Sequence, residues 1–257
     1  MRARRIAVRV LPPLLLLIVV LAVWEALVAI TDVRPSILPA PSDVFSSLWH
    51  NRTLLLDNAR VTVEEIALGY LLAIVVGVCL AVLVSSSRHV ERAVYPWLVV
   101  SQMIPIVAIA PIIVIWTGFD IRPKLIVIAL VSFFPIAVNT IDGIQATEPE
   151  LLRLLRTLGA GRWKRFTAAQ FPSALPFLFS GLKVAAALAV IGAVFAEWVG
   201  SSAGLGYLIL TLNNQLATAD MFAAIVVLAL IGIALFGLVQ LLERVAMPWR
   251  RAERRGA

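Results

Sequence analysis

The chain has 257 residues, of which 61% are hydrophobic and only 14% charged, and its formal net charge is +7. Ordinary soluble domains carry about 25% charged residues, so this composition excludes a soluble enzyme and indicates a polytopic membrane protein. The single cysteine excludes an intramolecular disulfide, and the two histidines lie far apart without other ligand-type residues, so no metal site is expected. The cations gather at the ends of apolar runs, which argues against nucleic acid as a partner.

Six apolar segments are each about long enough to cross a hydrocarbon core of roughly 30 Å. They cover residues 11–30, 64–85, 97–117, 124–142, 178–199 and 221–243. Prolines interrupt the third segment at Pro105 and Pro111 and the fourth at Pro135, where we expect a kink. The pattern predicts an all-α, polytopic membrane bundle of about six transmembrane helices.

The first twenty residues, MRARRIAVRVLPPLLLLIVV, have the charge and hydropathy pattern of a signal peptide. No small-residue cleavage site follows them, and the apolar run continues to Ile30. We therefore expect an uncleaved first span within residues 1–32. A core domain over 33–248 and a basic tail over 249–257 complete the expected organisation.

Lysine and arginine are distributed unequally between the two ends of these segments. With a cytoplasmic N-terminus, sixteen of the 22 fall on the inner side, while Lys183 lies just inside the fifth segment. Five fall on the outer side: Arg34, Arg52, Arg60, Arg122 and Lys124. Because positive charge is retained on the cytoplasmic side, both termini of this multi-pass chain are expected there.

The inner loop between the fourth and fifth segments, residues 145–177, contains a polar stretch that resembles a helix. Thr147 is a plausible N-cap, with Pro149 and Glu150 in the first turn, and Gly159 is a natural stop after the last turn. Four leucines fall on one face by their spacing: Leu151, Leu154, Leu155 and Leu158. A second short helix is expected over 162–170, ending at Phe171-Pro172. The pair either lies against the membrane surface or docks on another protein.

This loop resembles the cytoplasmic "EAA" loop of ATP-binding-cassette (ABC) importer permeases, which reads Glu-Ala-Ala, three residues, Gly, nine residues, Ile-x-Leu-Pro. Gly159 and Pro172 stand at that spacing, with Ala169 and Phe171 at the two apolar positions between them. Residues 153–155 read Arg-Leu-Leu in place of Glu-Ala-Ala. Any role of the motif's glutamate therefore does not carry over to this chain.

Further blocks resemble the same permeases, in order along the chain. They are ILPAPSDV (37–44), MIPIVAIAPIIVIWTGF (103–119), FFPIAVNTIDGI (133–144) and AEWVGSSAGLGYLI (196–209). The last three are similar to permeases of the nitrate, sulfonate, taurine and pyrimidine importer group. Within that group, 103–119 and 196–209 look most like permeases for thiamine-precursor pyrimidines or riboflavin-type heterocycles. A sulfonate, taurine or nitrate importer is the alternative.

The resemblance implies a type I ABC importer permease of the bacterial inner membrane. Its partners would be a second permease copy, two cytoplasmic ABC ATPase subunits and an extracytoplasmic solute-binding protein, in contact with membrane lipids. ATP and Mg would be used by the ATPase, because no P-loop pattern occurs in this chain and no catalytic residue or bound cofactor is expected. A coupling helix at about 148–158 would engage the ATPase through these residues of the loop: Glu150, Leu151, Leu154, Leu155, Arg156, Leu158, Gly159 and Pro172.

Polar or irregular positions inside spans are candidates for the solute pathway, because such residues are costly in lipid. We select Gln102, Met103, Pro105, Asn139 and Glu197. Hydrogen bonding between helices or a position at the interface is the alternative for each polar member, and we favour that interpretation for Glu25 and Asp142. A secondary transporter driven by an ion gradient and a scaffold without transport are the competing functions.

Overall fold

The computed structural model describes residues 2–31 and 33–248, so the basic tail expected at 249–257 lies outside the described part. Every regular element in that part is a helix, which confirms the predicted all-α class. Five helical stretches are long and apolar enough to cross a membrane. They are α1 (Arg2–Thr31), α3 (Arg52–Ser85), α6 (Arg122–Gln145), a continuous stretch ending in α9 (Arg162–Gly200) and α11 (Thr218–Ala246).

The third expected span is a broken pair rather than one straight helix. α4 (Arg88–Ser101) and α5 (Ile106–Thr117) meet at an angle of 97°. Pro105 is the N-cap of α5; it has no backbone N–H and disfavours helical conformation at the preceding residue, which favours a break at this point. Counted as one span, the pair brings the total to six, as expected. In contrast, α6 continues through Pro135 without a break.

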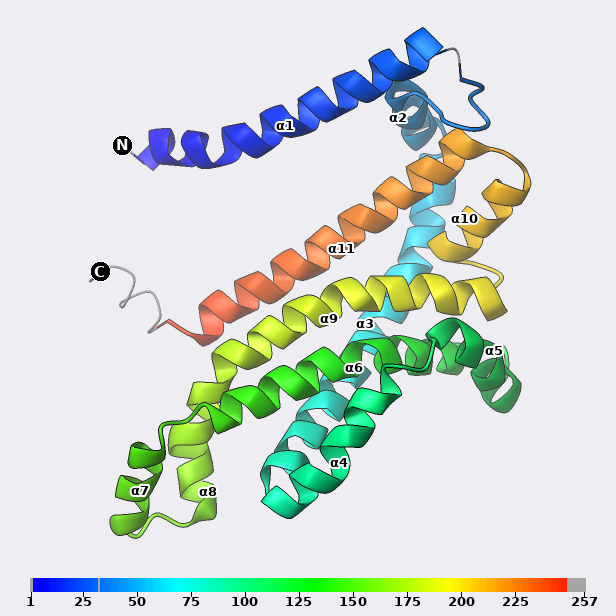
Figure 1. The fold of residues 1–257 in the computed structure, drawn as a ribbon. Coiled ribbons are helices and arrows are strands. Elements are labelled where there is room, and N and C mark those ends of the chain that lie inside the picture. The colour runs from blue at the N-terminus through cyan, green and yellow to red at the C-terminus, as the bar shows by residue number, and fades with distance from the viewer. Residues whose placement is uncertain (1, 32, 249–257) are drawn as a thin grey trace.

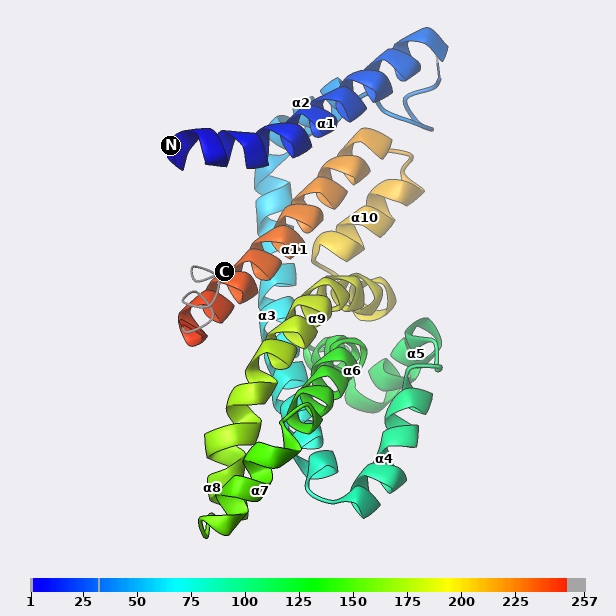
Figure 2. The ribbon, with the colours of Figure 1, turned by 60° about the vertical axis from the view of Figure 1, so that its left-hand side comes forward.

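Three short helices lie between the spans: α2 (Pro41–His50), α7 (Pro149–Thr157) and α10 (Leu205–Asn214). Figures 1 and 2 show α7 on the same side of the molecule as the start of α1 and the end of α11. α10 and α5 lie towards the opposite side. A chain that crosses a membrane an even number of times has both ends on the same side, as this arrangement does.

α6 is the centre of the bundle and packs against both α3 and α9 (Phe171–Gly200). It is the most buried span, with 56% of its most apolar stretch inside the protein. Ile128 and Ile136 of α6 are fully buried in the largest apolar cluster. On α9 the facing residues are small and also fully buried: Ala185, Ala186, Ala189 and Ala193.

Glycines let the backbones of these helices approach closely. A Cβ placed on Gly69 of α3 would lie 2.7 Å from Ile128, and one on Gly77 would lie 2.9 Å from Ile136. On α9, a Cβ at Gly181 would lie 2.5 Å from the carbonyl oxygen of Pro135. Association in lipid depends on such close packing, because apolar side chains gain little by leaving the lipid.

Polar contacts add specific ties across the bundle. The Tyr70 hydroxyl of α3 donates to the carbonyl of Leu182 on α9 at 2.7 Å. Lys183 of α9, which lies just inside the fifth expected segment, forms an ion pair with Glu243 of α11. Glu25 of α1 accepts hydrogen bonds from the Ser42 amide and hydroxyl of α2 at 3.0 and 2.7 Å, which confirms a contact between helices.

We predict that Gly181→Ala destabilises the helical bundle by about 1–3 kcal/mol, because the added methyl overpacks the contact between α9 and α6. Thermal unfolding of the purified chain in mild detergent should show a lower midpoint. Gly237→Ala on α11 is the matched control, since a Cβ there meets nothing within 4 Å. Equal midpoints for the two variants would show that the close approach at Gly181 is not a constraint.

Candidate coupling and pathway sites

α7 is the helix predicted in the inner loop, and its start is one residue later than expected. The N-cap is Glu148, and Pro149 is the first helical residue, where its missing N–H costs nothing. Thr147 does not cap α7, so that prediction is wrong. Its buried hydroxyl donates to the Ile144 carbonyl at 3.0 Å and so belongs to the end of α6.

Gly159 ends α7 in the manner its position predicted. Its φ is +76°, a left-handed conformation that glycine adopts without strain. The Gly159 amide donates to the Arg156 carbonyl at 3.0 Å, and the Ala160 amide donates to the Leu155 carbonyl at 2.9 Å. These two bonds form a Schellman motif, which satisfies the last carbonyls of the helix and fixes the direction in which the chain leaves.

The leucine face of α7 is open. Leu151, Leu154 and Leu158 are 39%, 56% and 73% exposed, and no residue of the helix is buried. Leu155 is half-buried. Glu150 and Arg156 lie exposed in the first and last turns, where their charges suit the helix dipole. A short helix with an apolar exposed face suits either of the two expected positions, against the membrane surface or against another protein.

The second helix of the loop does not end at Phe171-Pro172, which corrects the sequence-based expectation. α8 (Arg162–Arg165) passes through one π-helical turn, η1 (Phe166–Gln170), directly into α9. The Phe171 amide donates to the Phe166 carbonyl, five residues back. This wider turn comes immediately before Pro172, which has no N–H to donate, so the chain remains helical where proline would otherwise interrupt it.

The break between α4 and α5 holds three of the five pathway candidates. Gln102 ends α4, Met103 follows it, and Pro105 begins α5. All three side chains are exposed, Met103 by 74%. Non-helical backbone at membrane depth is tolerated where protein covers it or where it lines an aqueous cavity.

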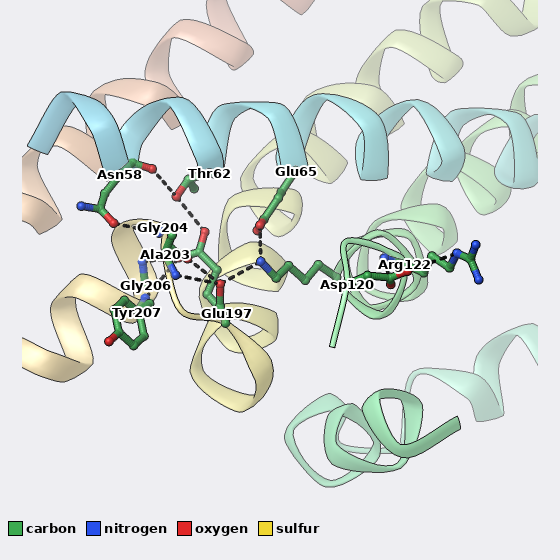
Figure 3. Close-up of polar contacts among 12 residues, drawn as sticks. Asn58, Thr62, Glu65, Asp120, Arg122, Glu197, Ala203, Gly204, Gly206 and Tyr207 are labelled. Carbon is green, nitrogen blue, oxygen red and sulfur yellow. Dashed lines mark hydrogen bonds and ion pairs between the residues drawn. The ribbon is translucent and has the colours of Figure 1, made fainter. Parts of the chain in front are cut away.

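The other two candidates lie elsewhere. Asn139 of α6 is half-buried, beside the close contact at Gly181, and its amide donates to the Pro135 carbonyl at 2.8 Å. Glu197 of α9 is buried and forms the centre of a polar network at the α5 and α10 end of the bundle (Figure 3). The structure therefore groups three of the candidates and separates two from them.

The Glu197 carboxylate caps the N-terminus of α10. It accepts hydrogen bonds from the Thr62 hydroxyl at 2.7 Å and from the Gly206 and Tyr207 amides at 2.5 and 3.2 Å. Two further amides are satisfied by α3: Gly204 donates to Asn58 at 2.9 Å, and Leu205 donates to the Thr62 hydroxyl at 2.8 Å. A negative charge at a helix N-terminus is favourable, and here it also satisfies otherwise unpaired donors.

The glycines at the start of α10 leave room for this carboxylate. A side chain at Gly204, whose φ is +109°, would overlap the Glu197 carboxylate, and a Cβ at Gly206 would lie 3.0 Å from its oxygen. Lys124, at the start of α6, extends the network by pairing with Glu65 at 2.5 Å and donating to Ser201 at 2.7 Å. The network thus joins α3, α6, α9 and α10.

Comparison with known proteins agrees with this architecture. The sequence model of the family described as "Binding-protein-dependent transport system inner membrane component" matches residues 69–246, which include α6, the α7 loop and α9. The chain belongs to this family. It is therefore a permease component of an ABC transporter and a multi-pass membrane protein.

Similar permeases transport several kinds of solute according to their names. The formylaminopyrimidine transport permease protein ThiX of Halalkalibacterium halodurans is 38% identical over 95% of this chain and 97% of its own length. The riboflavin transport system permease protein RibX of Chloroflexus aurantiacus is 36% identical over 91% of this chain and 88% of its own. A crystal structure of an amino acid ABC transporter shares the fold, with a TM-score of 0.62 at 16% identity, covering 78% of this chain and 97% of that one.

Sequence analysis missed most of the network in this permease. Asn58, Thr62 and Glu65 lie at intervals of four and three residues, so they share a face of α3. That spacing could have predicted a polar cluster on one face of this helix. Their partner Lys124 was counted only as an outer topology charge. Among the described residues, no group of three or more His, Cys, Asp or Glu side chains could hold a metal ion.

We predict that Glu197→Ala lowers the thermal stability of the permease, because it leaves the Gly206 and Tyr207 amides without their acceptor, whereas the Thr62 hydroxyl keeps the Asn58 carbonyl at 3.2 Å. Each orphaned buried donor costs about 1–3 kcal/mol. Thermal unfolding in detergent measures the change. Asp57→Ala, which removes an exposed acid from the same region of α3, is the control and should leave the midpoint unchanged. A midpoint for Glu197→Ala equal to that of Asp57→Ala would contradict the capping role.

Proposed function

We propose that this permease forms the solute pathway of an ATP-driven importer of the bacterial inner membrane and works as a homodimer. Each copy engages one of two cytoplasmic ATPase subunits through α7, and an extracytoplasmic binding protein delivers the solute. ATP and Mg²⁺ are used by the ATPase; this chain binds no cofactor and catalyses no reaction. Family membership and the named relatives support the class of transporter.

The observation that carries the proposal is the form of α7. It is an exposed amphipathic helix, held at one end by α6 and at the other by the Schellman turn at Gly159. Such a helix offers a defined surface to a partner, because only three residues join it to α6 and the Schellman turn fixes the direction in which the chain leaves it. Its exposed leucines provide the apolar area that a docking contact needs.

The connection of α7 to the spans supports a mechanical role. α6 leads into α7 through three residues, 146–148, and α8 continues through η1 into α9 without a break. α6 and α9 also pack closely along their length. When the ATPases close on ATP, a displacement of α7 therefore moves α6 and α9 together as a rigid pair. Rocking of these pairs in the dimer opens the pathway to one side and then to the other.

The distribution of charge supports a cytoplasmic position for α7 and both termini. α7 lies on the same side of the molecule as the start of α1 and the end of α11 (Figures 1 and 2). The loop that contains α7 and α8 carries five of the basic residues: Arg153, Arg156, Arg162, Lys164 and Arg165. Positive charge on one side of a membrane protein marks the cytoplasmic side.

The break between α4 and α5 is the part of the chain best suited to line the pathway. Gln102, Met103 and Pro105 are exposed there, at a point where the backbone leaves the helical conformation. Asn139 and Glu197 remain candidates, although both side chains make hydrogen bonds inside the subunit. The solute that we propose is a thiamine-precursor pyrimidine or a riboflavin-like heterocycle, because the relatives named for formylaminopyrimidine and riboflavin are 38% and 36% identical.

We predict that Gly159→Val uncouples ATP hydrolysis from transport. Valine at a φ of +76° costs about 1–2 kcal/mol, so the end of α7 rearranges and the docking face moves. In proteoliposomes holding the complete transporter, solute uptake should fall severalfold, and hydrolysis should lose its dependence on the loaded binding protein.

Gly161→Val is the matched control in the same loop. A Cβ meets nothing within 4 Å at either glycine, but Gly161 has a φ of −63°, which valine adopts freely. Equal uptake by the two variants would count against the role of the Gly159 turn. Uptake driven by an ion gradient in a preparation without ATPase would favour a secondary transporter instead.

The solute can be identified on the cognate binding protein, through thermal shift with pyrimidines, flavins, taurine and nitrate. Ligand at a hundred times its Kd stabilises a folded receptor by about 2.7 kcal/mol, so the transported class should raise the unfolding midpoint clearly. We expect a pyrimidine or a flavin to do so. A response to taurine or nitrate alone would assign the permease to the alternative group of importers.

A further inference from the structure

A basic cavity of about 430 Å³ lies between the end of α3 and the loop of α7 and α8. Three arginines line it: Arg156 at the end of α7, and Arg162 and Arg165 of α8. Ser85 and Ser86, where α3 ends, line the other side. Cationic guanidinium groups and the Ser85 hydroxyl thus surround one space, which is the chemistry that binds phosphate, whereas the Ser86 hydroxyl donates to the Leu83 carbonyl.

The cations of this cavity are not neutralised within the described residues. No ion pair there involves Arg156, Arg162 or Arg165. The Arg165 Nε and the Ser85 hydroxyl are enclosed, yet neither makes a hydrogen bond to any described residue. Buried polar groups are nearly always paired, so these two atoms call for an acceptor from outside the chain.

An apolar groove of about 180 Å³ continues from this cavity along the spans. The two spaces share Val82, Ile144 and Phe166 in their walls. Side chains of α3 and α9, among them Val78, Leu175 and Leu178, form much of the rest, and the exposed lining of the groove is entirely apolar. A basic cavity thus opens onto an apolar groove between spans.

We propose that this composite site binds one anionic glycerophospholipid. The three arginines and Ser85 hold its phosphate, and the groove between α3 and α9 takes part of one acyl chain. The position suits a lipid, since Trp163 of α8 borders the cavity and is 75% exposed, as tryptophans are at the edge of a membrane. Basic pockets between transmembrane helices are a general form of headgroup site.

The location gives the lipid a role in the proposed coupling mechanism. Leu152 and Arg156 of α7 border the same cavity as Ser85 of α3, so a bound phosphate connects the coupling helix to a span with which α7 has few direct contacts. This role, and the assignment of the lipid to the inner leaflet, rest on the proposed function. The binding site itself does not, because it is tested without ATPase or solute.

The test is native mass spectrometry of the full-length permease in mild detergent, titrated with dioleoyl phosphatidylglycerol or dioleoyl phosphatidylcholine. We expect one saturable phosphatidylglycerol per chain and about tenfold weaker binding after Arg162→Gln with Arg165→Gln, because two charges that face the phosphate are lost. The control is Arg153→Gln with Lys164→Gln, which removes two exposed charges from the same loop that do not border the cavity, and should bind as the parent does.

A second pair of variants tests the groove. Val82→Trp fills the junction of the cavity and the groove and should also weaken binding about tenfold, whereas Leu83→Trp, exposed on the same turn of α3, should not. Equal loss in the two charge pairs, or equal affinity for phosphatidylcholine, would overturn the proposal. Displacement of the lipid by millimolar inorganic phosphate or glycerol 3-phosphate would overturn it in favour of a soluble anion. Its displacement by the purified ATPase would show a protein contact instead.

Discussion

The close approach of α6 to α9 and α3 is the constraint on which the rest of this permease depends. Apolar side chains are as well solvated by lipid tails as by one another, so the bundle is held by packing that requires backbones to come close. Gly69 and Gly77 receive isoleucines of α6, and Gly181 lies against the Pro135 carbonyl. Larger residues at these glycines would separate the helices and remove the dispersion contacts between them.

The same contact extends to the end of the bundle that carries α7. A Cβ at Gly143, near the end of α6, would lie 2.8 Å from the Ala174 backbone of α9. The two helices are therefore in contact just before α6 passes into α7 and just after η1 passes into α9. A loop whose two ends are so joined cannot move one span without the other, which supports its role as a lever in the proposed mechanism.

At the opposite end, a polar network has an equivalent structural effect. The carboxylate of Glu197 and the side chains of Asn58 and Thr62 supply acceptors to the first amides of α10. Lys124 pairs with Glu65 and so ties the start of α6 to α3. Burying a charge in this way is costly unless the charged group is fully hydrogen-bonded. Most of the carboxylate oxygens of Glu65 and Glu197 have a hydrogen-bond partner. The bundle is thus fixed at both ends of α6 and α9. In contrast, the side chains at the break between α4 and α5 remain exposed.

The sequence alone determined the class of protein, the approximate spans, the amphipathic helix between the fourth and fifth expected spans and the glycine that ends it. Each of these depends on local composition or on spacing along one helix, such as the leucines of α7 or the left-handed turn at Gly159. Only the tertiary structure decided that Pro105 breaks a span while Pro135 does not, that Pro172 lies inside a continuous helix, and that Glu197 caps α10. These outcomes depend on which residues distant in sequence become neighbours: Thr62 lies 135 residues from Glu197 along the chain, and no local pattern records that the two meet.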